Sequence, residues 1–168
     1  MTLHLALPRD IQATLVEALL KGGADEIGGI MMAEHVGPAH FRVVEITVQL
    51  QGGSFARFVR AVLNFMDPLK AFFKKTFFNY RKFNYIGEWH SHPSFALEPS
   101  GTDCETMQSL VEDSTVGANF AILLLVRLGP ANELEAVATV FVPHSVCFPA
   151  SVILENDAPR KADRTQLP

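Results

Sequence analysis

The sequence has few cysteines, few charges and no long hydrophobic run. Only Cys104 and Cys147 occur among 168 residues, which excludes the disulfide framework of a small secreted domain. No apolar run approaches the roughly 18 residues that a transmembrane helix needs. The first residues lack the basic start and cleavage site of a signal peptide. We therefore expect a soluble, cytoplasmic protein that does not bind membranes.

The charge balance also narrows the function. Charged residues make up 19 % of the chain and the net charge is −4, which argues against a nucleic-acid binder. Hydrophobic residues make up 48 %, enough for the core of one domain. We expect a single domain over residues 1–155, followed by a polar, aromatic-free and flexible tail over residues 156–168.

Hydrophobic periodicity and turn residues predict an α/β or α+β fold in which strands and helices are interleaved. Pro8 before an amphipathic stretch, Asp67-Pro68 and Ser100 are typical helix starts. The expected helices cover residues 8–21, 67–79 and 100–113. The expected strands cover residues 27–33, 41–50, 84–92, 120–127, 133–142 and 151–154.

Two histidines separated by one residue are the most informative feature that is present. His90 and His92 point to the same side of an extended strand because strand side chains alternate. Asp103 follows after a loop that contains Pro93 and Pro99. Two imidazoles and one carboxylate leave the fourth position of a tetrahedral zinc open for water, which is the catalytic arrangement. The sequence therefore predicts a zinc hydrolase with one Zn²⁺ per chain.

Ser100 and Asp103 also have a structural interpretation. Ser100-Gly101-Thr102-Asp103 resembles a capping box, with Asp in place of the usual Glu or Gln. Capping would fix both side chains at the loop end of the helix, on the side of the histidines. The capping role and the metal role are therefore compatible.

The spacing H-x-H-x7-S-x2-D, with Glu26-Ile27-Gly28-Gly29 upstream, resembles the JAMM (MPN-plus) metallopeptidase family. The sequence Gly87-Glu88-Trp89-His90-Ser91-His92-Pro93 is similar to that of the prokaryotic branch of this family. The resemblance implies the MPN/JAB fold, a curved mixed β-sheet flanked by helices and related to the cytidine-deaminase layer arrangement. Deaminase chemistry itself is disfavoured, because its H-x-E and P-C-x-x-C pattern is absent.

The resemblance also implies a role for each site residue. His90, His92 and Asp103 would bind the zinc. Glu26 would hold the attacking water as general base and pass its proton to the leaving amine. Ser100 would donate a hydrogen bond to the developing oxyanion.

By the same resemblance, the substrate would be a ubiquitin-like protein joined through its C-terminal Gly to a lysine amine or a peptide. A bacterial ubiquitin-like conjugation or antiphage-defence pathway would supply activating and conjugating enzymes as further partners. Two alternatives stay open. One is a non-catalytic scaffold of the MPN type; the other is a processing peptidase for a sulfur-carrier-type ubiquitin-like precursor.

Three neighbouring residues need separate interpretations. Glu88 shares the strand face of the histidines and is a rival for the general base, or a group that orients a histidine. Ser91 points to the opposite face and is expected to pack or to form hydrogen bonds. Cys104 follows a ligand on a helix and is expected to be structural, because adjacent helical side chains diverge by about 100°.

Residues 65–85 interleave aromatic and basic side chains. Half of the 14 lysines and arginines lie between Arg57 and Lys82. An amphipathic helix with a buried aromatic side is the simplest interpretation. Docking of an acidic partner or a substrate tail is the second, and contact with nucleic acid or membrane is the third.

Overall fold

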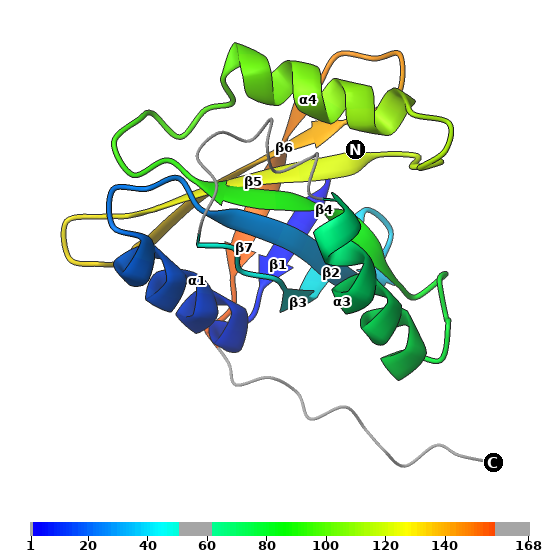
Figure 1. Ribbon diagram of the computed structural model, residues 1–168, viewed down its shortest axis with the longest axis horizontal. Helices are drawn as coiled ribbons and strands as arrows, with labels where there is room; N and C mark the ends of the chain where they lie inside the picture. Colours follow the sequence, from blue (N-terminus) through cyan, green and yellow to red (C-terminus); the bar gives the residue numbers. More distant parts are fainter. Residues whose placement is uncertain (1, 51–61, 157–168) are drawn as a thin grey trace.

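A computed structural model describes residues 2–50 and 62–156 of the chain (Figure 1). Its helices are α1 (Arg9–Gly22), α3 (Val62–Lys75) and α4 (Gly101–Glu112). Its strands are β1 (His4–Leu7), β2 (Gly28–Gly37), β3 (His40–Ile46), β4 (Phe83–Ser91), β5 (Ala121–Leu128), β6 (Leu134–Phe141) and β7 (Phe148–Leu154). In this part of the chain no helix is long and apolar enough to cross a membrane.

The strands form one mixed sheet that closes on itself in the order β1-β3-β2-β4-β5-β6-β7. The pairs β1–β3, β1–β7 and β4–β5 are parallel, and the others are antiparallel. The expected α/β class with a curved mixed sheet is confirmed. The curvature goes further than expected, because pairing of β1 with β7 closes the ring.

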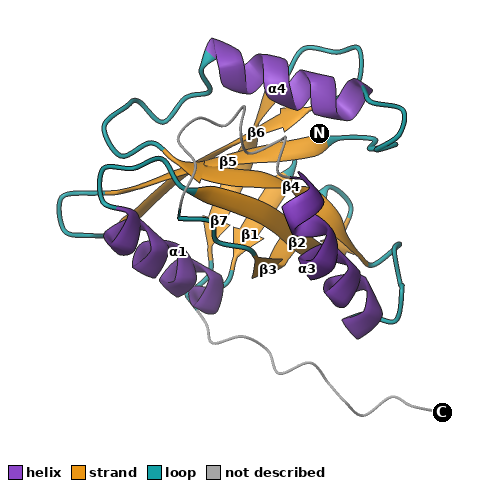
Figure 2. Cartoon of the chain, in the orientation of Figure 1, coloured by secondary structure: helices purple, strands orange, loops and turns teal. Residues whose placement is uncertain are grey.

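The three helices are arranged around the sheet (Figure 2), and α1 packs in one apolar cluster while α3 and α4 pack in another. Ile11 and Leu15 of α1 pack in the same apolar cluster as Trp89 and Leu124. Phe72 of α3 and Met107 of α4 belong to a second cluster. Alternation along β4 and β5 separates the two clusters, because neighbouring side chains point to opposite faces. The face that packs against α1 forms the main core, and the other face is covered by α3 and α4.

Two glycines let β2 approach its neighbours closely. A Cβ on Gly28 would lie 2.5 Å from the Trp89 carbonyl oxygen, and a Cβ on Gly29 would lie 1.8 Å from that of Thr47. Side chains at these positions would push the strands apart. The Gly-Gly pair thus brings the chain after Glu26 directly against β4, where Gly28 pairs with His90.

The prediction for α3 was wrong at both ends. The helix already includes Val62, the first residue described after position 61, so Asp67-Pro68 lies inside it rather than at its start. The apolar residues before Asp67 continue the helix although Pro68 lacks the N–H for one backbone hydrogen bond. The helix ends at Lys75, four residues before Asn79, because Phe77 (φ 53°) and Phe78 (φ 56°) adopt left-handed backbone conformations.

The strand predictions differ from the structure mainly in length. β1 was missed, since four residues give too short a pattern. β3 ends at Ile46 rather than Leu50, although Gln49 still bridges to Gly28. β2 and β7 are longer than predicted. The expected tail beyond Asn156, together with Arg57 and Arg60, lies outside the described residues.

Candidate metal centre

The ligand residues are placed by the end of a strand and the start of a helix. His90 lies on β4, and His92 follows the last residue of this strand. The His92 N–H donates to the Val126 carbonyl at 2.9 Å, which continues the pairing of β4 with β5. Asp103 lies in the first turn of α4. The end of β4 and the first turn of α4 therefore bring the three residues together.

The three side chains converge in a buried cluster. His90, His92 and Asp103 offer ligand atoms that all lie within 4.8 Å of one another. The two Nε2 atoms are 3.0 Å apart. Asp103 Oδ1 lies 3.6 Å from His90 Nε2, and Oδ2 lies 3.7 Å from His92 Nε2. Each residue is at most 6 % exposed, so water hardly screens the cluster.

These distances fit a tetrahedral metal ion. Around zinc with bonds of about 2.0–2.1 Å, neighbouring donor atoms lie roughly 3.3–3.4 Å apart. The observed separations of 3.0, 3.6 and 3.7 Å bracket this value. Two imidazoles and one carboxylate are also a donor set that zinc accepts readily. The cluster therefore fits the expected zinc.

A backbone carbonyl orients His92. Its Nδ1 lies 2.8 Å from the carbonyl oxygen of Ala96. Because a carbonyl only accepts, Nδ1 carries the proton and the Nε2 lone pair faces the cluster. This is the outer-shell arrangement that holds metal-binding histidines. The sequence carried no signal for Ala96, because a backbone carbonyl is present at every position.

Asp103 is held as a carboxylate. Burial alone would raise its pKa, but His90 and the hydrogen bonds from Ser100 outweigh burial and bring the pKa to about 2. The Ser100 N–H donates to Asp103 Oδ2 at 2.7 Å, and the Asp103 N–H donates to Ser100 Oγ at 3.2 Å. The predicted capping box is confirmed. It fixes the ligand carboxylate while Asp103 keeps both oxygens directed toward the histidines.

Comparison with known proteins identifies the family. A family model described as prokaryotic homologs of the JAB domain matches residues 8–142. The chain belongs to this family. The chain is also 29 % identical over 129 residues to a protein named CD-NTase/cGAS isopeptidase from Enterobacter hormaechei subsp. hoffmannii (strain UCI 50). The match covers 75 % of this chain and 68 % of that protein.

The fold has a counterpart among solved structures. The solution structure of protein DSY2949 from Desulfitobacterium hafniense matches with a TM-score of 0.56 at 12 % sequence identity. The match covers 92 % of this chain and 94 % of that chain. At this identity the likeness concerns the fold alone. The JAB family and the isopeptidase-named relative together indicate a hydrolase.

Glu26 of this JAB chain lies beside the ligand strand. It is half-buried and lies two residues before the start of β2. The next residue, Ile27, exchanges hydrogen bonds with Ser91: the Ser91 N–H donates to the Ile27 carbonyl at 2.8 Å, and Ser91 Oγ accepts from the Ile27 N–H at 3.0 Å. Ser91 is thus a hydrogen-bonding residue, as predicted. The backbone at Glu26 is fixed next to the segment that carries both histidines.

Ser100 is solvent-exposed at the start of α4. Its hydroxyl oxygen accepts the capping hydrogen bond from Asp103. A hydroxyl also has one hydrogen to donate, so capping leaves the donor function of Ser100 free. The proposed interaction with an oxyanion is therefore compatible with the cap.

Glu88 has a partner that the sequence did not reveal. The Tyr85 hydroxyl lies 3.4 Å from Glu88 Oε1. Burial raises the pKa of Glu88 to about 7, although the hydrogen bond from Tyr85 lowers it. Burial and the neighbouring Glu88 hold the pKa of the Tyr85 phenol well above its usual range. The phenol therefore stays protonated and acts as the donor.

Cys104 and Cys147 are both free thiols. Both pack against the cluster beneath α3 and α4. Burial and the proximity of Cys147 raise the pKa of Cys104, which keeps it protonated. Within the described residues, the candidate metal-binding group contains neither cysteine.

Proposed function

We propose that this chain is a zinc-dependent isopeptidase that removes a protein from a conjugate. The observation that carries the proposal is the buried convergence of His90, His92 and Asp103. Three protein ligands leave one position open for substrate or water, in contrast to the four protein ligands of structural zinc sites. Membership of the JAB family supports the same reaction class.

The chemistry needs a nucleophile, stabilisation of charge and a proton for the amine. Zinc, when bound, would supply a Lewis acid that activates water and polarises the scissile carbonyl. Glu26 takes one proton from the attacking water and later transfers it to the leaving amine. The Ser100 hydroxyl donates a hydrogen bond to the oxygen on which negative charge develops. Bond cleavage then releases a carboxylate and a free amine.

The name of the relative guides the choice of substrate. That protein is called a CD-NTase/cGAS isopeptidase, so a conjugate of a CD-NTase-type enzyme is the first candidate. The motif resemblance adds a second, a ubiquitin-like protein joined through its C-terminal Gly. We place the reaction in the bacterial cytoplasm, in a pathway that also contains activating and conjugating enzymes, with antiphage defence as its biological role.

A direct test combines metal content with cleavage. Purified wild-type protein is expected to hold about one zinc per chain. It should also cleave a CD-NTase-type or ubiquitin-like conjugate and release the protein that contributed the C-terminal carboxyl group. Glu26→Gln should keep the zinc and lose turnover, because the ligands remain and the base is gone. His92→Ala should lose both. Absence of zinc uptake by the wild type, or full activity of Glu26→Gln, contradicts the proposal.

The same experiment separates the alternatives. A scaffold of the MPN type would cleave neither conjugate, even with zinc bound. A processing peptidase would cleave a linear ubiquitin-like precursor but leave an isopeptide bond to lysine intact. Genes for activating and conjugating enzymes next to the gene of this chain would favour deconjugation, and genes of cofactor synthesis would favour processing.

A further inference from the structure

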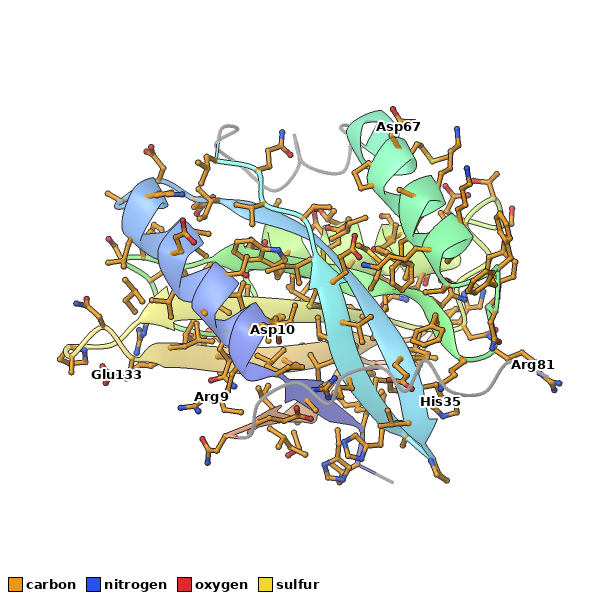
Figure 3. All side chains as sticks on the ribbon, turned by 90° about the horizontal axis from the view of Figure 1, so that it is seen from below. Arg9, Asp10, His35, Asp67, Arg81 and Glu133 are labelled. Atoms are coloured by element: carbon orange, nitrogen blue, oxygen red, sulfur yellow. The ribbon has the colours of Figure 1, made fainter. Side chains whose placement is uncertain are left out.

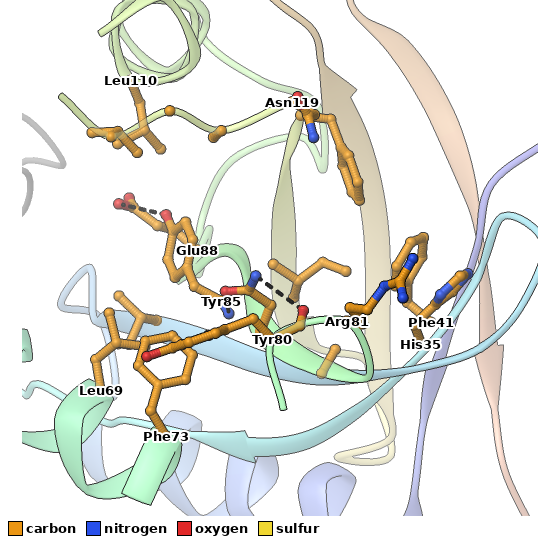
Figure 4. A pocket seen from close by; sticks show the side chains of 18 of the residues that line it. His35, Phe41, Leu69, Phe73, Tyr80, Arg81, Tyr85, Glu88, Leu110 and Asn119 are labelled. Carbon is orange, nitrogen blue, oxygen red and sulfur yellow. Dashed lines mark hydrogen bonds between the residues drawn. The ribbon is translucent and has the colours of Figure 1, made fainter. Parts of the chain in front are cut away.

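A cavity lies on the sheet face that also carries the histidines. It has a volume of about 820 Å³ and is bordered by α3, α4 and the chain before β5 (Figure 4). Leu69 of α3 and Leu110 of α4 are part of its apolar lining. Arg81 and His35 lie toward the same end of the molecule (Figure 3) and at the opposite end of the cavity from Glu88 (Figure 4). A cavity with apolar walls and few polar groups is typical of a binding site.

The buried end of the cavity carries an acidic group that lacks a full set of partners. Glu88 is 2 % exposed and lines the cavity. Its Oε1 accepts a hydrogen bond from Tyr85, while no donor within the described residues reaches its Oε2. A buried carboxylate oxygen without a partner costs free energy. A ligand that donates a hydrogen bond there would remove this cost.

The surroundings of Glu88 match one class of donor. Aliphatic walls from Leu69 and Leu110 suit an unbranched hydrocarbon stem, and the rings of Tyr85, Phe73 and Tyr80 favour a cation. Lysine and arginine side chains combine such a stem with a cationic head that only donates. We infer that this cavity binds a lysine or arginine side chain of the substrate, with the cation on Glu88.

Glu88 lies close enough to the metal cluster to determine substrate specificity. This part of the inference rests on the proposed isopeptidase function. Glu88 and His90 lie on the same face of β4, and two residues of strand span about 7 Å. An extended substrate segment with its scissile carbonyl at the metal cluster places side chains at this distance. The recognised basic residue therefore lies within about three positions of the cleaved bond.

The test measures binding without turnover, in zinc-loaded full-length Glu26→Gln. The probes are fluorescein-labelled alanine octapeptides with a C-terminal Gly, in which one lysine is moved along the peptide. Each is paired with a peptide that has norleucine at the same position, which keeps the stem and lacks the ammonium group. Fluorescence anisotropy should show about tenfold tighter binding of the lysine peptide at one position.

Adding Glu88→Gln to this variant should reduce the ratio of the norleucine-peptide Kd to the lysine-peptide Kd to about one. The Kd of the norleucine peptide should stay unchanged. Glu105→Gln on the exposed surface of α4 removes the same charge elsewhere and should keep the preference. Tyr85→Phe, which leaves the carboxylate in place, should also keep it. Equal binding of paired peptides at every position, including no measurable binding of either, overturns the inference, as does a preference that survives Glu88→Gln.

The two proposals fail in different ways. If the wild-type protein cleaves no conjugate but still shows a lysine preference that depends on Glu88, the isopeptidase proposal is rejected and the binding role of the cavity stands. If the protein cleaves a conjugate but shows no lysine preference, the isopeptidase proposal stands and the binding role of the cavity is rejected.

Discussion

Ser91 Oγ accepts a hydrogen bond from the Ile27 N–H at 3.0 Å. The residue between the two histidines thereby holds the residue that follows Glu26. The same hydroxyl also donates to the Asp25 carbonyl at 3.3 Å, so both sides of Glu26 are tied to the ligand strand. The Ser91 hydroxyl thus helps to fix the position of Glu26, the proposed general base, relative to His90 and His92.

We therefore expect Ser91→Ala to lower kcat by roughly tenfold, because a displaced base works poorly, while zinc content stays unchanged. Loss of the buried hydrogen bond should also cost about 1–2 kcal/mol of stability. Kinetics on the conjugate and denaturant unfolding measure the two effects. Ser109→Ala removes a hydroxyl that bonds within α4 and serves as the control. A stability loss with normal kcat would mean that other contacts hold Glu26.

Zinc should stabilise the folded chain. The three ligands are preformed only in the native state, and a ligand at 100 times its Kd stabilises by about 2.7 kcal/mol. Thermal unfolding with zinc and with a chelator measures this difference. His92→Ala should abolish the zinc effect. An equal increase in Tm in this variant would show that zinc binds elsewhere.

Glu88 should make stability depend on pH. Its pKa is about 7 in the folded protein and about 4.5 in the unfolded chain, so the native state holds its proton more tightly. The resulting stabilisation is fully present below about pH 4.5 and is lost as the pH rises through about 7. We expect Glu88→Gln to become more stable relative to wild type over this range, on the order of 3 kcal/mol.

Denaturant unfolding of both chelated proteins between pH 5 and 8 measures this effect, with Glu105→Gln as the control for loss of an exposed charge. Parallel curves for wild type and Glu88→Gln would mean that Glu88 ionises normally.

The turn after α3 holds an exposed aromatic residue in a strained conformation. Phe77 is 90 % exposed with φ 53°, a region that costs a non-glycine residue roughly 1 kcal/mol or more. Phe77→Gly should therefore raise stability by about 1 kcal/mol. If the turn contacts the conjugate, the same change should raise KM. An unchanged KM would show that the strained backbone at Phe77 has no role in substrate binding.

The convergence of His90, His92 and Asp103 was predictable because it follows from local spacing along one strand and one helix start. Alternation placed His90 and His92 on one side of the strand, and the helix-start pattern placed Asp103 beside Ser100. The orientation of His92 by Ala96 and the Tyr85–Glu88 pair were not predictable, since each depends on tertiary packing.

The same limit explains the error in the basic-aromatic segment. Phe72 is buried as expected for the aromatic side of an amphipathic helix, but Phe77 and Phe78 are exposed. The prediction extended one helical period past Lys75, whereas the left-handed backbone at these two residues turns the chain back toward β4. Local sequence preference does not favour this conformation for phenylalanine, so the pattern could not reveal it.

The position of Trp89 also makes the chain its own spectroscopic probe. It is the single tryptophan of the sequence, it is fully buried, and its Nε1 donates to the Thr47 carbonyl at 2.9 Å. It directly precedes His90 on β4 but points to the opposite face. Its emission thus arises from one buried indole, attached to the strand that carries His90. A change in emission wavelength or intensity during metal loading or unfolding therefore reports on that strand without any attached dye.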